Sequence, residues 1–143
     1  MSKTIIWATD GSDAADHALQ SAKSLGVCDD AALVVVHSED YLIGPRSMGP
    51  TPVRADEPEL KARIESQVDT LRKEGVSATL RLVNGVAPGT AHGIAEVAEE
   101  LGADLIVVGT RGHSPVAGLL LGSVTQRLLH VAPCPVLAVP AKA

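Results

Sequence analysis

Short apolar runs alternate with stretches of helical periodicity along the whole chain. The runs have the length of strands and carry no regular polar alternation, which predicts strands covered on both faces. The predicted strands are Ile5–Thr9, Ala31–His37, Ala78–Val83, Asp104–Gly109 and Pro135–Val139. Four helices are predicted. The first is capped by Ser12 or Asp13, and the other three span Glu57–Glu74, Pro88–Leu101 and Ser123–Val131.

Capping residues mark the ends of these helices. Ser12 has the side chain preferred at a helix N-cap, and Gly26 is predicted to end the helix that it opens. Gly75 is predicted to stop the second helix and Gly102 the third, whose first turn suits Pro88.

The alternation of strand and helix predicts a single α/β domain spanning 1–143. Right-handed crossovers place helices on both faces of a parallel sheet, so we expect a Rossmann-like, doubly wound sheet of five strands. Ligands of such sheets bind at the carboxyl ends of the strands, where the strand order reverses. The segments at that end are Asp10–Ser12, His37–Asp40 and Gly109–Ser123.

Composition and charge narrow the classes of function. The 143 residues carry a net charge of −5 and include only two aromatic side chains, Trp7 and Tyr41. Dispersed basic residues and scarce stacking platforms argue against a nucleic-acid partner, and the apolar runs are too short to span a membrane. Cys28 and Cys134 form no metal or redox motif, as is typical of thiols in a reducing cytoplasm.

The sequence also lacks the motifs of several enzyme classes. Its five histidines contain no i, i+4 pair, and Ser12 does not stand in a G-x-S-x-G elbow. We therefore assign no catalytic residue and no metal ligand from the sequence.

Residues 42–56, LIGPRSMGPTPVRAD, form the one long segment that fits neither helix nor strand. Three prolines and two glycines predict a loop there, and long loops of compact domains are often functional. Arg46 and Arg54 either reach a bound phosphate or lie in solvent, and the sequence leaves both alternatives open.

A glycine-rich segment follows the fourth predicted strand. It reads Gly109-x2-Gly112-x9-Gly122-Ser123 and matches neither the P-loop nor the dinucleotide fingerprint. Glycines let the backbone approach a ligand closely, and the N–H groups at the start of the next helix favour an anion such as phosphate. The alternative is a plain connector, because Ser123 and Gln126 also fit a capping box.

This spacing resembles the signature of the universal stress protein family in its ATP-binding class. The similarity extends over the whole chain, through ATDGS at 8–12, VVVHS at 34–38, NGVAPGTAHGIAEVAEELGADLIVVGTRG at 84–112 and APCPVLAV at 132–139. The resemblance implies that ATP binds at the end of the sheet.

The resemblance also implies which residues contact the nucleotide. Asp10 is expected near the ribose or adenine, and Ser38 beside the adenine, where the family usually has an apolar residue. The full set of implied contacts is Ala8, Thr9, Asp10, Ser38, Val108, Gly109, Arg111, Gly112, His113, Gly122, Ser123 and Val124. Within it, the phosphates are expected at Gly112, Gly122, Ser123 and Val124, flanked by Arg111 and His113.

The function that follows is a nucleotide-dependent regulator in the stress response. One alternative is a slow ATPase in which Ser123 and the phosphates hold Mg²⁺, and another is a flavodoxin-like redox domain, which the scarcity of aromatic residues disfavours. The strand Pro135–Val139 is apolar and carries no charge, so we expect it to be an edge strand that can pair with a second copy. The resemblance implies a homodimer through this strand.

Overall fold

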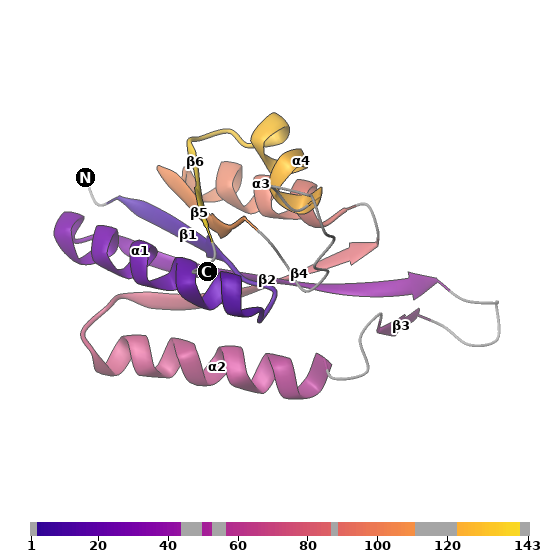
Figure 1. The fold of residues 1–143 in the computed structure, drawn as a ribbon, viewed down its shortest axis with the longest axis horizontal. Coiled ribbons are helices and arrows are strands. Elements are labelled where there is room, and N and C mark those ends of the chain that lie inside the picture. The colour runs from indigo at the N-terminus through magenta and orange to yellow at the C-terminus, as the bar shows by residue number, and fades with distance from the viewer. Residues whose placement is uncertain (1–2, 44–49, 53–56, 87–88, 111–122, 141–143) are drawn as a thin grey trace.

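The computed structural model describes residues 3–43, 50–52, 57–86, 89–110 and 123–140, and Figure 1 shows their arrangement. Its strands are β1 (Thr4–Ala8), β2 (Ala32–Ile43), β3 (Pro50–Pro52), β4 (Ala78–Val86), β5 (Leu105–Gly109) and β6 (Val136–Val139). Its helices are α1 (Asp13–Asp29), α2 (Glu57–Lys73), α3 (Thr90–Leu101) and α4 (Ser123–Val131). None of the helices in these ranges combines the length and the apolar character needed to cross a membrane.

The sheet has six strands, of which five are parallel in the order β4-β2-β1-β5-β6 and the sixth, β3, pairs antiparallel with β2. The chain moves from β1 through β2 to β4 on one side, then crosses to β5 and β6 on the other. The strand order therefore reverses beside β1, as in a doubly wound sheet. The predicted α/β fold with five parallel strands is confirmed.

The helices form one layer on each face of the sheet. Alternate residues of β1 show why: Ile5 and Trp7 pack in the cluster that contains side chains of α1 and α2, whereas Ile6 and Ala8 pack with α3 and α4. Figure 1 shows α1 and α2 on one side of the sheet and α3 and α4 on the other. Both faces of the central strand are thus buried, which explains its continuous apolar run.

The first helix is longer than predicted. Gly26 lies inside α1, and Asp30 ends the helix with a left-handed conformation at φ 50°. Asp tolerates this region better than most residues, so it replaces the expected glycine. Gly75 and Gly102 do follow the ends of α2 and α3 with positive φ, as predicted, and Ser12 is the N-cap of α1.

The prediction that 42–56 forms neither helix nor strand is wrong in part. β2 continues to Ile43, and Tyr41–Ile43 pair antiparallel with Pro50–Pro52 of β3. β1 ends at Ala8, opposite Val36, so β2 has no partner from β1 beyond this point. That side of the β2 extension is therefore open for pairing with β3. Proline lacks an N–H but is accepted on an edge strand, which explains how β3 holds two prolines.

Candidate functional site

The carboxyl ends of β1 and β5 lie side by side, next to residues 36–38 of β2, at the point where the strand order reverses. β1 pairs with β2 through Ala8 and with β5 through Trp7. The N-termini of α1 and α4 follow β1 and β5 at this same edge. The sheet therefore brings the predicted segments at 8–12, 37–38 and 108–109 together.

The turn from β1 to α1 is closed by its own side chains. The Gly11 amide donates to Thr9 Oγ1 at 3.0 Å, and the Ser12 amide donates to Asp10 Oδ1 at 2.9 Å. Ser12 Oγ then accepts from the Ala15 amide at 3.2 Å, which caps α1. The half-buried Asp10 carboxylate is thus held at the end of β1.

The middle of β2 is tied to the end of β1 by a buried histidine. The ring of His37 is 2% exposed, and Nδ1 donates to the carbonyl oxygen of Thr9 at 2.9 Å. Ser38 follows within β2, because the strand predicted to end at His37 continues beyond it. Its Oγ lies 3.3 Å from Thr90 Oγ1 in the first turn of α3. Sequence reasoning missed Thr90, since a threonine that opens a helix is a common capping residue and carries no sign of a distant partner.

The end of β5 packs tightly against the start of α1. A Cβ on Gly109 would lie 2.9 Å from both the carbonyl carbon and oxygen of Ala14, and 3.1 Å from the Ala15 nitrogen. Thr125 Oγ1 donates to the Gly109 carbonyl at 3.0 Å, so the first turn of α4 is anchored to β5. The glycine at 109 is therefore explained by helix packing, and Thr125 is an anchor that the sequence did not reveal.

The remaining predicted positions divide into two groups. Ser123 begins α4 as predicted, and Val124 beside it is 39% exposed. Arg111, Gly112, His113 and Gly122 lie outside the described residues. Among the described histidines, cysteines and carboxylates, no group of three is placed to hold a metal ion.

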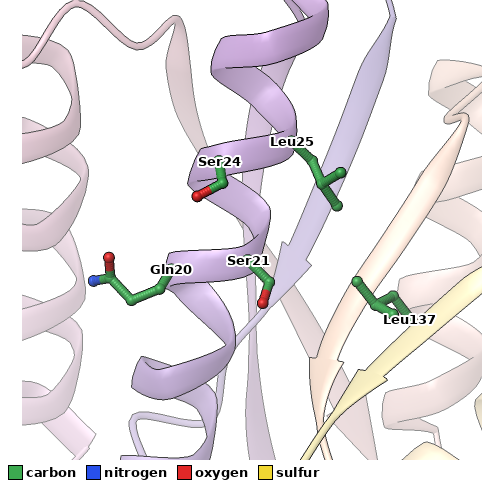
Figure 2. Close-up of a pocket in the computed structure, with 5 residues that line it drawn as sticks. All are labelled: Gln20, Ser21, Ser24, Leu25 and Leu137. Carbon is green, nitrogen blue, oxygen red and sulfur yellow. The ribbon is translucent and has the colours of Figure 1, made fainter.

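A shallow hollow lies elsewhere, between α1 and β6, and contains none of the predicted site residues. It has a volume of about 430 Å³ and is lined by Gln20, Ser21, Ser24, Leu25 and Leu137. Figure 2 shows Leu25 and Leu137 facing each other across it. The hollow lies beside the edge strand β6 and not at the point where the strand order reverses.

Comparison with known proteins identifies the family. A model of the universal stress protein family matches residues 1–140. The chain belongs to this family. The resemblance inferred from the glycine spacing is thereby confirmed. Membership of this family argues against the flavodoxin-like alternative.

Relatives within the universal stress protein family match almost the full chain. A universal stress protein from Thermus aquaticus, encoded in the QAH/OAS sulfhydrylase 3' region, is 36% identical over 97% of this chain and 99% of its own length. The structure of the Archaeoglobus fulgidus family member in complex with dAMP has a TM-score of 0.69 and 26% identity, covering 97% of this chain and 98% of that one. A universal stress protein in complex with cAMP has a TM-score of 0.68 and 27% identity, covering 99% and 98%.

Proposed function

We propose that this protein binds an adenine nucleotide at the carboxyl ends of β1 and β5 and the adjoining residues of β2, with ATP as its ligand. The observation that carries the proposal is the convergence of Asp10, Ser38 and Gly109 beside the N-terminus of α4, where the strand order reverses. Family members of nearly the same length hold dAMP and cAMP, which supports an adenine nucleotide as the ligand class.

The residues have distinct roles in this proposal. The first group faces the nucleoside and consists of Ala8, Thr9, Asp10, Ser38, Val108 and Gly109. The second group binds the phosphates and consists of Arg111, Gly112, His113, Gly122, Ser123 and Val124. The amides at the start of α4 suit phosphate because their N–H groups have no partner within the helix, and the helix dipole favours negative charge. Mg²⁺ would bind through the phosphates and the Ser123 hydroxyl.

The role proposed for the bound nucleotide is regulation of the stress response rather than rapid turnover. The sequence contains no Gly-Lys pair, so it lacks the lysine with which P-loop enzymes stabilise the transferred phosphoryl group. We expect ATP to be hydrolysed more slowly than about 1 s⁻¹, the lower end of ordinary enzymes. Release of phosphate from saturating ATP with Mg²⁺ measures this rate, and faster turnover would favour the ATPase alternative.

Calorimetric titration tests the ligand and the phosphate loop together. We expect ATP to bind the wild type at micromolar concentration, about −8 kcal/mol, and Gly112→Val to weaken binding by at least tenfold because a branched side chain blocks the backbone from the phosphates. AMP, dAMP and cAMP, titrated in parallel, separate recognition of the nucleoside from recognition of the phosphate chain. Equal affinity for ATP in the two proteins, both folded by circular dichroism, would contradict the phosphate-loop assignment.

We also propose that two copies associate through β6. In the described residues β6 pairs only with β5, so its outer edge offers backbone groups for a further strand. Leu137 is 37% exposed there and borders the hollow against α1 (Figure 2), which leaves room for a partner's side chain.

A charged residue at position 137 tests this interface. We expect Leu137→Lys to sediment as a monomer where the wild type sediments as a dimer, because two lysines would be buried near each other across the paired edges. Leu82→Lys is the matched control, since Leu82 is 39% exposed on β4, at the opposite end of the strand order, and should leave the dimer intact. A dimeric Leu137→Lys variant would place the interface elsewhere.

A further inference from the structure

Helix α2 contacts the β1–α1 turn at two successive positions. Leu60 is 7% exposed and packs over Gly11, where a Cβ would lie only 1.9 Å from Leu60 Cδ1. One turn further along α2, Arg63 Nη1 donates to the carbonyl oxygen of Gly11 at 2.8 Å. The turn is thus covered by α2 at Gly11.

The guanidinium group of Arg63 joins this turn to the first helical residues of α1. Its Nη2 donates to the Asp16 carboxylate, and Gln67 Nε2 donates to Asp16 Oδ1 at 3.0 Å. Asp16 lies in the first turn of α1, where a carboxylate is favourable to the helix dipole. The planar guanidinium group can donate to the carbonyl and the carboxylate at the same time in fixed directions, whereas a lysine ammonium would act as a point charge.

These contacts fix one peptide plane from two sides. The Gly11 carbonyl and the Ser12 N–H belong to the same planar unit. Arg63 binds the oxygen of that unit, and Asp10 Oδ1 accepts from its nitrogen at 2.9 Å. Gly11 has φ of 78°, and a glycine there leaves the plane free to rotate unless both ends are held. Arg63 and the Asp10 carboxylate therefore bind the two ends of the same peptide unit.

We propose that Arg63 is a positioning residue of the nucleotide site, which acts through the Gly11 carbonyl and Asp16 to orient Asp10 toward the nucleoside. This inference rests on the nucleotide-binding function proposed above. The Arg63 side chain is 49% exposed, and ion pairs at such exposure contribute little to stability. The contact therefore matters for the geometry of the turn more than for the free energy of unfolding.

The chain offers a matched control on the same helix. Arg72 Nε donates to the carbonyl oxygen of Ala78 at 2.8 Å, so Arg72 also links α2 to a backbone carbonyl, but at β4 and far along the helix from the turn. Arg63→Ala and Arg72→Ala each remove one such bond. We expect Arg63→Ala to weaken ATP binding about tenfold in calorimetric titration and Arg72→Ala to change it less than twofold.

A double-mutant cycle separates positioning from a general loss of structure. If Arg63 acts through Asp10, Arg63→Ala has no further effect on affinity in an Asp10→Ala background, because the group that it orients is gone. Arg63→Lys is expected to restore less than half of the lost affinity, as measured by the change in log Kd. Additive losses in the cycle would overturn the positioning role.

Hydrogen exchange of the nucleotide-free protein gives a readout independent of binding. We expect the Ser12 amide to exchange at least tenfold faster in Arg63→Ala than in the wild type, and at the wild-type rate in Arg72→Ala. Unchanged exchange at Ser12 would overturn the inference. A wild type that binds ATP while Arg63→Ala binds it equally well overturns this inference alone, whereas a wild type that binds no adenine nucleotide overturns the proposed function with it.

Discussion

Gly109→Ala is expected to lower the free energy of unfolding by about 1–3 kcal/mol, the range of an overpacked core position. The added methyl would lie 2.9 Å from the carbonyl carbon and oxygen of Ala14. Those atoms belong to the backbone of α1, so no side-chain rotation relieves the contact, and the first turn of the helix must shift away from β5. Urea denaturation followed by circular dichroism measures the loss.

Gly26→Ala is the matched control for this substitution. Gly26 lies inside α1, and beyond its own stretch of helix no atom of the described residues lies within 4 Å of the Cβ that alanine would add. Because alanine has the higher helix propensity, we expect a gain of about 0.5–1 kcal/mol. The same substitution therefore has opposite signs at the two positions. A Gly109→Ala variant as stable as the wild type would mean that α1 and β5 approach each other less closely than described.

Trp7→Ala is expected to lower the free energy of unfolding by about 3–5 kcal/mol. Trp7 is fully buried in the middle of β1 and is among the largest of the described buried side chains. Its Nε1 also donates to the carbonyl oxygen of Ala15 at 2.9 Å, which links the central strand to α1. Trp7 is the only tryptophan of the chain, so unfolding of the variant is followed by circular dichroism rather than by fluorescence.

Two further variants show how much of the loss in stability comes from the hydrogen bond and how much from burial. Trp7→Phe keeps a ring but removes the hydrogen bond, and we expect it to lose about 1–2 kcal/mol. Val27→Ala truncates a side chain that is 64% exposed on α1, and we expect a change within about 0.5 kcal/mol. A Trp7→Ala variant that unfolds at the same urea concentration as Val27→Ala would contradict the burial of Trp7.

The layered fold could be predicted because the local patterns agree with one another. The run Ile5–Ala8 of β1 is apolar at every position because both faces of the strand are covered, and Ser123–Val131 forms the predicted helix with the predicted bounds. The end of α1 could not be predicted in the same way. A glycine and an aspartate four residues apart both accept a left-handed or flexible backbone, and tertiary packing selected Asp30.

Pairings between distant segments account for what the sequence did not reveal. β3 forms because β2 extends beyond the end of β1, and nothing within 42–56 itself signals that partner. Arg63 and Gly11 are 52 positions apart, as are Ser38 and Thr90. From the sequence, an arginine on a polar helix face is predicted to lie in solvent. Its hydrogen bond to a turn in another part of the chain becomes evident only from the three-dimensional structure.

The position of β1 in the sheet has a consequence for synthesis of the chain. β1 leaves the ribosome before the other strands of this sheet, yet it pairs with β5, and the amide of Thr4 donates to Asp104 Oδ2 at 2.8 Å, a contact across 100 positions. Until residues 105–109 emerge, the nascent polypeptide can build only the half-sheet β4-β2-β1, with one flank of its innermost strand exposed. Such an intermediate is prone to aggregate, so holdase chaperones should engage this protein most strongly during that interval of translation.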